Sequence, residues 1–130
     1  MGGIPEYNAE LSNEICKGTG AVVVSISYRY APKYVFPAAI DDVDEILCYL
    51  RENAKEKYGA DPCLMTVSGL SAGGNLALAA AQQPECHAPS PTSIKAAVTF
   101  YAVVSTTSLT VLQLLFPVFY SIETLLLREF

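Results

Sequence analysis

Apolar residues recur at helical spacing near the start of the chain. In residues 5–17, Leu11 and Ile15 stand four positions apart among polar neighbours, which predicts an amphipathic helix. Gly18 and Gly20 follow directly, and we expect these glycines to end the helix.

A longer helix is predicted from Pro37 to about Tyr58, and Gly59 is expected to end it. Pro37 suits the first helical position, because the N–H that proline lacks would have no partner there. Acidic residues in the first turns and basic residues in the later turns complement the helix dipole. Apolar positions three and four residues apart form one stripe: Ala39, Val43, Ile46, Leu47, Leu50 and Ala54.

Short apolar runs predict strands at residues 21–28, 64–68 and 94–102. The first run is nearly continuous and β-branched, the pattern of a strand covered on both faces. Residues 75–82 are apolar on all sides, which predicts a buried helix. Strands that alternate with helices predict an α/β fold, with parallel strands and helices on both faces of the sheet.

The composition agrees with this fold, and the net charge disfavours one class of partner. The 130 residues suit a single domain, and 52% are hydrophobic while 16% are charged. The charged share is low against the usual figure of about 25%, as expected where strands are buried on both faces. The net charge of −5 disfavours nucleic acid as a partner, because a phosphate backbone would repel the chain.

The cysteines predict neither a metal site nor a disulfide framework. Cys16, Cys48, Cys63 and Cys86 form no C-x-x-C pair, and the sequence holds one histidine, His87. We therefore expect no metal and no cofactor, and four free, mostly buried thiols in a reducing compartment. The first residues carry no basic start and no apolar run, so no secretory signal is predicted and a cytoplasmic location is expected.

The carboxyl-terminal part of the chain is apolar from Val103 to Leu127, a length that could span a bilayer. Pro117 and Glu123 interrupt the run, and a charged side chain is costly in lipid. A core segment without its partners is favoured over a membrane span. We expect residues 1–104 to form a partial domain and residues 105–130 to be an apolar segment whose role the pattern does not define.

Gly69-Leu70-Ser71-Ala72-Gly73 matches G-x-S-x-G and lies between a predicted strand and a predicted helix. The chain must reverse direction there within a few residues, which predicts a strained backbone at Ser71 and glycines where side chains would collide. Gly74 extends the glycine-rich turn. Such a turn holds the serine hydroxyl at a helix N-terminus, where the N–H of Ala72 points at a developing oxyanion. An ordinary glycine-rich turn is the alternative interpretation.

Three further blocks of sequence precede this motif and, together with it, make a set of four. They are Tyr28-Arg29-Tyr30-Ala31-Pro32-Lys33, Phe36-Pro37-Ala38-Ala39 with Asp42, Gly59-Ala60-Asp61-Pro62, and Gly69-Leu70-Ser71-Ala72-Gly73-Gly74-Asn75. In this order they resemble the hormone-sensitive-lipase branch of the α/β hydrolases, from about residue 20 to about residue 102. The resemblance implies an incomplete α/β-hydrolase fold and a carboxylic ester hydrolase acting on a small-molecule ester, with Ser71 as nucleophile and Ala72 as one oxyanion donor.

The same resemblance implies roles for residues within these blocks, and the sequence departs from the family at two positions. Asp61-Pro62 is expected to set the turn before the nucleophile strand, and Arg29 to be a buried structural arginine. Leu70 stands where the family usually has an acidic residue, and Leu64 where it usually has an arginine.

Parts of the family's site have no counterpart in the sequence. The family's His-Gly-Gly-Gly oxyanion loop is absent, and Gly2-Gly3-Ile4 resembles the stretch just downstream of that loop, so a truncated hydrolase is expected. By resemblance, the strand before that loop would lie between the strands at 22–28 and 64–68. Its absence predicts a gap in the sheet with unpaired backbone groups, unless the two flanking strands close up.

A serine nucleophile needs a base, and the base needs an orienting carboxylate. In α/β hydrolases these residues follow the serine in the order acid, then histidine. His87 and Glu85 are the weak candidates for base and acid, and a surface loop histidine is the favoured interpretation of His87.

Three hypotheses follow from the sequence. A catalytically competent esterase would need His87 and Glu85, or a base from a partner. A hydrolase with an intact serine turn and no activity is favoured. A non-catalytic binding module, or a chain held at a membrane by residues 103–127, is the third hypothesis. The oligomeric state is left open.

Overall fold

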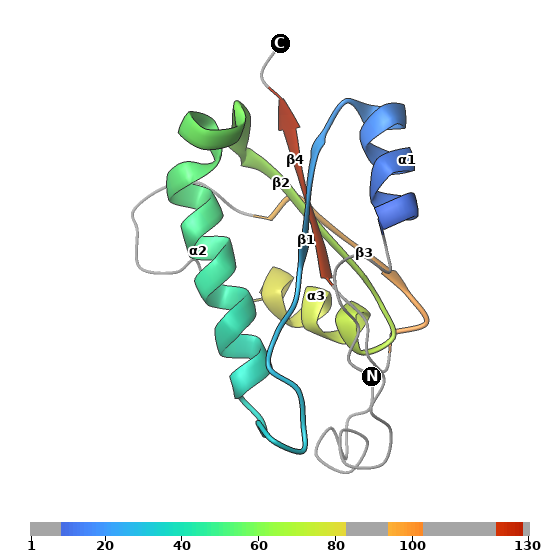
Figure 1. The fold of residues 1–130 in the computed structure, drawn as a ribbon, viewed down its shortest axis with the longest axis vertical. Coiled ribbons are helices and arrows are strands. Elements are labelled where there is room, and N and C mark those ends of the chain that lie inside the picture. Colours follow the sequence, from blue (N-terminus) through green and yellow to red (C-terminus); the bar gives the residue numbers. More distant parts are fainter. Residues whose placement is uncertain (1–8, 83–93, 103–121, 129–130) are drawn as a thin grey trace.

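The computed structural model describes residues 9–82, 94–102 and 122–128 (Figure 1). Three helices pack against a four-stranded sheet. The elements in chain order are α1 (Ala9–Thr19), β1 (Val22–Ile26), α2 (Ala38–Tyr58), β2 (Ala60–Leu70), α3 (Ala72–Gln82), β3 (Ala96–Phe100) and β4 (Ile122–Arg128).

Helix α1 confirms the first predicted helix but corrects how that helix ends. Gly18 lies inside α1 and does not stop it. The helix ends at Gly20, whose φ of 71° is in the left-handed region and whose N–H donates to the carbonyl of Cys16 at 2.9 Å. A glycine with helical dihedral angles leaves the ladder intact, so only the second glycine ends the helix.

Helix α2 matches its predicted length and its predicted buried face. It begins at Ala38, which leaves Pro37 one position before the first helical residue, and it ends at Gly59. Gly59 has a φ of 62°, and its N–H donates to the carbonyl of Lys55 at 3.1 Å. The predicted stripe faces the core, with Val43, Leu47, Leu50 and Ala54 buried, and with Ala39 and Ile46 partly buried against them.

The core lies between these helices and the sheet. Residues of α2 meet Met65 and Val67 of β2, and Leu76 and Ala77 of α3 join the same cluster. Burial of each large apolar side chain contributes about 1.5–3 kcal/mol, so this cluster holds α2 and α3 against β2. The prediction of a helix buried on all sides is wrong near the end of α3, where Gln82 is exposed.

Strand β2 is longer than predicted and begins at Ala60. Asp61-Pro62 therefore lies inside the strand and not in a turn before it. An Asp61 carboxylate oxygen accepts the N–H of Cys63 at 2.8 Å, and the pairing with β4 shifts between Ala60 and Met65. The Asp-Pro pair accordingly marks an irregularity in the strand, where a side chain takes the place of a ladder partner.

The sheet has the order β1-β4-β2-β3. β2 and β3 are parallel, and β1 and β2 both run antiparallel to β4, so the three predicted strands all point the same way. Helix α2 connects β1 to β2, and α3 connects β2 to β3. α1 and α2 lie on opposite sides of β1 in Figure 1. The predicted α/β class with parallel strands is confirmed.

The expected gap in the sheet is filled. β4 lies between β1 and β2, and Thr124 pairs with Val24 on one side and with Val67 on the other. Neither an open gap nor direct pairing of β1 with β2 occurs. β4 pairs with the backbone groups that β1 and β2 direct toward each other. This pairing stabilises the sheet, since unpaired buried N–H and C=O groups are costly.

Part of the apolar carboxyl-terminal segment therefore belongs to the sheet. Residues 122–128 form β4, whereas residues 103–121 lie outside the described residues. Within the described ranges, no helix has both the length and the apolar character needed to cross a membrane.

Candidate functional site

Ser71 lies at the edge of the sheet where the three parallel strands end. Ile122, the first residue of β4, pairs with Ile26 at the end of β1 and with Gly69 near the end of β2. The turn at Ser71 and the loop that follows β1 therefore flank the start of β4. In open α/β sheets, ligands bind outside the carboxyl ends of the parallel strands. Ser71 lies at this end of the sheet.

The strand-to-helix turn at Ser71 is as short as the motif predicts. β2 ends at Leu70, α3 begins at Ala72, and Ser71 alone lies between them. Its φ is 51°, in the left-handed region that non-glycine residues seldom adopt, which confirms the predicted backbone strain. Two hydrogen bonds fix this conformation. The N–H of Ser71 donates to the carbonyl of Phe100 at 3.0 Å, and its carbonyl accepts the N–H of Asn75 at 3.1 Å.

The glycines of the motif let the two arms of this turn approach each other. A Cβ atom on Gly69 would collide with the backbone C and O atoms of Gly73 and lie 2.7 Å from the nitrogen of Gly74. A Cβ atom on Gly74 would lie 3.0 Å from the carbonyl oxygen of Gly69 and 3.1 Å from the Cβ of Ala102. Glycine at both positions therefore avoids the collision that a side chain would cause, as the motif predicts.

The turn places Ser71 at the N-terminus of α3. Ala72 is the first residue of this helix, where backbone N–H groups have no acceptor within the helix and carry a partial positive charge. Ser71 is only 7% exposed, so the serine is enclosed by the surrounding elements. The arrangement is suited to stabilising negative charge beside Ser71.

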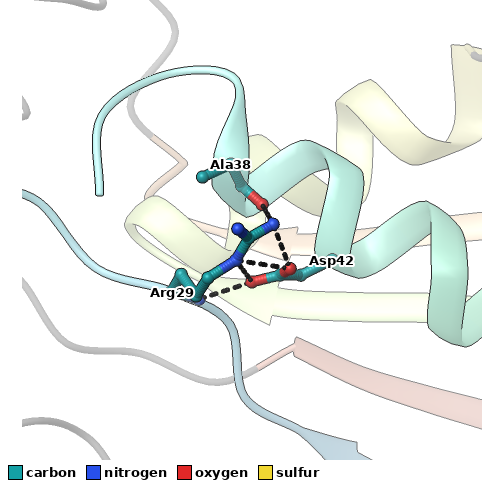
Figure 2. Close-up of polar contacts among 3 residues, drawn as sticks. All are labelled: Arg29, Ala38 and Asp42. Atoms are coloured by element: carbon teal, nitrogen blue, oxygen red, sulfur yellow. Dashed lines mark hydrogen bonds and ion pairs between the residues drawn. The ribbon is translucent and has the colours of Figure 1, made fainter.

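An ion pair ties the loop after β1 to α2 at the same edge (Figure 2). The Arg29 Nε donates to both carboxylate oxygens of Asp42, at 2.8 and 3.0 Å, and an Arg29 terminal nitrogen lies 2.7 Å from the carboxylate. The backbone N–H of Arg29 also donates to Asp42 at 2.7 Å, and the guanidinium reaches the Ala38 carbonyl at 3.4 Å. The expectation of a buried Arg29 is wrong, since its side chain is 47% exposed, but its structural role is supported by these contacts.

The Arg29 side-chain hydrogen bonds hold the pKa of the Asp42 carboxyl below its usual range. A lowered pKa in the folded state means that the pair stabilises the fold above the usual carboxyl pKa. This contribution is lost as the pH falls through the lowered pKa. We expect Asp42→Asn to lower the urea midpoint at neutral pH, and the difference from the unmodified chain to shrink in acid.

The control for this prediction is Asp41→Asn, which removes the same charge from a neighbouring exposed position. Urea titrations followed by circular dichroism, at a series of pH values, measure both variants. Equal midpoints for the two variants at neutral pH would contradict a specific role for the Arg29–Asp42 pair.

Tyr28 lies just before this ion pair and does not offer a base. Burial, and secondarily the neighbouring Tyr30, raises the pKa of its phenol above the ordinary value. Its hydroxyl is buried, and no residue of the described part of the chain accepts or donates a hydrogen bond to it. Its ring packs 4.8 Å from that of Tyr30. A phenol with a raised pKa stays protonated at neutral pH and is an aromatic packing residue.

The structure brings together one part of the predicted site. Gly69 near the end of β2, Ser71 in the turn, and Ala72, Gly73 and Gly74 at the start of α3 lie together. The candidates for base and acid, His87 and Glu85, lie outside the described residues.

The sequence predicted free, mostly buried thiols and no metal site. Cys16 is exposed, and Cys48 and Cys63 are partly exposed, so the expectation of mostly buried thiols is wrong for these three. None of the three forms a disulfide with another described residue. Cys86 lies outside the described residues. Across residues 9–82, 94–102 and 122–128, no three His, Cys, Asp or Glu residues gather as a metal site would need.

Comparison with known proteins identifies the family. The model of a protein family described as having the α/β-hydrolase fold matches residues 1–114. The chain belongs to this family. The match extends past Ala102, where the resemblance was expected to stop. No solved structure matches this α/β hydrolase.

The curated relatives of this α/β hydrolase are named as hydrolases. It is 51% identical over 74 residues to arylacetamide deacetylase from Oryctolagus cuniculus, covering 56% of this chain and 19% of the relative. It is 45% identical over 78 residues to neutral cholesterol ester hydrolase 1 from Bos taurus, covering 59% and 19%. It is 48% identical over 65 residues to carboxylesterase NlhH from Mycobacterium tuberculosis, covering 50% and 20%. The matches span about a fifth of each relative's length.

Sequence reasoning missed that β4 contributes to this edge of the α/β hydrolase. The segment Ile122–Arg128 was interpreted as part of an apolar tail. Its local pattern, three leucines between Thr124 and Arg128, is compatible with a strand but does not specify one.

Proposed function

We propose that Ser71 is the nucleophile of a carboxylic ester hydrolase site and that the N–H of Ala72 is one of its oxyanion donors. The observation that carries the proposal is the left-handed φ of Ser71, 51°, in a single-residue turn between β2 and α3. A serine held in this conformation at a helix N-terminus, within G-x-S-x-G, is the geometry of a nucleophile elbow. The close approach of Gly69 to Gly73 supports the same assignment.

The chemistry is acyl transfer. The Ser71 oxygen attacks the ester carbonyl carbon, its hydroxyl proton passes to a base, and the carbonyl oxygen becomes an oxyanion beside Ala72. When this intermediate collapses, the bond to the alkoxide breaks, and the base returns its proton so that an alcohol leaves. Water then hydrolyses the acyl-serine, which releases the carboxylic acid and restores the Ser71 hydroxyl. The N-terminus of α3 favours the oxyanion through its partial positive charge.

The relatives support esters as the substrate class. Two of them are named cholesterol ester hydrolase and carboxylesterase, and a third is named a deacetylase. For this chain we propose a small-molecule carboxylic ester as the substrate.

We propose further that the 130-residue chain by itself does not turn over esters. The step above needs a base, and His87 is the one histidine in the sequence. The 11 residues of α3 carry the chain about 16 Å from Ser71 before His87 is reached. The acids that follow Ser71 are Glu85, Glu123 and Glu129, so the order acid, then histidine is possible only with Glu85.

Labelling with a fluorophosphonate probe tests this second statement. We expect the purified chain, shown to be folded by circular dichroism, to label no faster than its Ser71→Ala variant. Labelling that disappears in Ser71→Ala would contradict the absence of a base and would support Ser71 as the nucleophile.

A chimaera tests the role of Ser71 separately. Residues 22–82 of this chain, from β1 to α3, would replace the corresponding segment of the rabbit deacetylase, which supplies the remaining parts of the site. We expect the chimaera to label and Ser71→Ala to abolish labelling. Ser68→Ala, a change of the same kind three residues earlier in β2, is expected to retain it. Equal labelling of both variants would contradict the assignment of Ser71.

A further inference from the structure

Two non-glycine residues in the described part of the chain have a positive φ, and each directly follows a strand. Ser71, with a φ of 51°, follows β2, and Tyr101, with a φ of 40°, follows β3. The two strands are parallel neighbours, and Leu70 pairs with Phe100 at their carboxyl ends (Figure 1). Residues held in such sparsely populated conformations cluster at functional sites, so Tyr101 is a candidate for a role beside Ser71.

The residues on both sides of Tyr101 contact the turn that holds Ser71 and the helix that follows it. Before Tyr101, the carbonyl of Phe100 accepts the N–H of Ser71 at 3.0 Å. After Tyr101, Ala102 packs against the first turn of α3, because a Cβ atom on Gly74 would lie 3.1 Å from the Cβ of Ala102 and 3.3 Å from its Cα. The first contact continues the ladder between β2 and β3, whereas the second brings the chain out of that ladder to α3.

The left-handed φ of Tyr101 allows both contacts at once. Rotation about the N–Cα bond of Tyr101 sets the direction of the following chain relative to the peptide plane that contains the Phe100 carbonyl. With an extended backbone at residue 101, either Ala102 would move away from Gly74, or that plane would rotate and take the carbonyl away from the Ser71 N–H. A strained conformation persists only where its surroundings hold it, and these two contacts do so here.

We propose that Tyr101 is a positioning residue for Ser71 and acts through its backbone conformation. It keeps in place the carbonyl that fixes the Ser71 N–H, and so it maintains the left-handed turn from which the serine hydroxyl would attack an ester. This inference rests on the proposed nucleophilic role of Ser71, and it requires no contact between the Tyr101 ring and a substrate.

Amino-acid types at position 101 should differ by the backbone that each accepts. Glycine adopts a positive φ without strain, so Tyr101→Gly should keep the geometry. A β-branched residue is a rare outlier in this region, so Tyr101→Val should move the chain out of the turn. A role carried by the ring would affect both variants equally, because both lack the ring.

Amide hydrogen exchange of the 130-residue chain, followed by NMR for individual residues, tests this positioning. We expect Tyr101→Val to speed exchange of the Ser71 N–H at least about tenfold, and Tyr101→Gly to change it by less than about threefold. The amide of Val67, in the middle of β2, should keep its protection in both variants, because it reports opening of the whole sheet. The matched control is Thr99→Val, which introduces valine inside β3 and should leave exchange at Ser71 unchanged.

Equal exchange at Ser71 in Tyr101→Val and in the unmodified chain would overturn the proposal, as would equal acceleration by Tyr101→Gly and Tyr101→Val. If Tyr101→Val does not fold, Tyr101→Gly decides alone. Faster exchange at Ser71 in the glycine variant, with Val67 still protected, would then overturn the proposal.

Fluorophosphonate labelling distinguishes this inference from the proposed function. In a chimaera that carries residues 22–102 of this chain in the rabbit deacetylase, Tyr101→Val should slow labelling about 100-fold, an effect of the size that a small misplacement of a reacting group produces. Tyr101→Gly should restore the labelling rate to within about threefold of the unmodified chimaera. Equal labelling of the valine variant and the unmodified chimaera would overturn the positioning role. An unmodified chimaera that does not label would contradict the role of Ser71, and the exchange rates alone would then decide the backbone role of Tyr101.

Discussion

Gly69→Ala is expected to destabilise the chain more than the same change at Gly18 or Gly74. The added Cβ would collide with the backbone C and O atoms of Gly73 and lie 2.7 Å from the nitrogen of Gly74. All three atoms belong to the backbone, so no flexible side chain can move aside. Relief of the collision requires β2 and α3 to separate at the turn that holds Ser71. We expect a loss of about 3 kcal/mol or more in the free energy of unfolding.

Two other glycines provide a graded comparison. Gly74→Ala brings the new Cβ to 3.0 Å from the Gly69 oxygen, a tight contact that costs less than the collision at Gly69. At Gly18, inside α1, nothing lies within 4 Å of the new Cβ, and alanine should stabilise the helix by about 0.5–1 kcal/mol. Urea denaturation followed by circular dichroism should rank the variants Gly18, Gly74, Gly69 in order of decreasing stability. A Gly69→Ala variant as stable as Gly18→Ala would contradict the close packing of the turn.

Thr124→Pro is expected to unfold the chain or to reduce its stability severely. Thr124 lies in β4, paired with Val24 of β1 on one side and with Val67 of β2 on the other. Proline has no N–H to donate to the ladder, and its ring does not fit within a central strand. The ladder acceptor left unsatisfied costs about 1–3 kcal/mol, and the misfit of the proline ring adds to this cost. This is a large share of the about 5–15 kcal/mol that stabilises a typical domain.

The control is Glu10→Pro in the first turn of α1, where a missing N–H leaves no hydrogen bond broken. Urea denaturation compares the two proline variants, and hydrogen exchange of the unmodified chain should show protected amides in residues 122–128. A Thr124→Pro variant with the unmodified urea midpoint would contradict the placement of β4 between β1 and β2.

The sequence determined the elements that depend on local pattern. The apolar stripe of α2 is set by spacing along one helix, and Gly59 ends that helix because it accepts a left-handed backbone. The turn at Ser71 is equally local, since strand, glycines, serine and helix follow one another within a few residues. Four blocks of sequence also predicted the family of the chain, and the comparison with known proteins confirmed that family.

Only the tertiary structure decided where β4 lies and how exposed Arg29 is. The local pattern of residues 122–128 is compatible with a strand, a core segment or part of a membrane span. Its position follows from the unpaired backbone groups of β1 and β2, which are distant in sequence and satisfied together by one added strand. The exposure of Arg29 likewise depends on how far the loop after β1 stands from the sheet, and side-chain type does not specify that distance. Local spacing therefore fixes elements and turns, whereas pairing between distant strands is decided by the groups that each leaves unsatisfied.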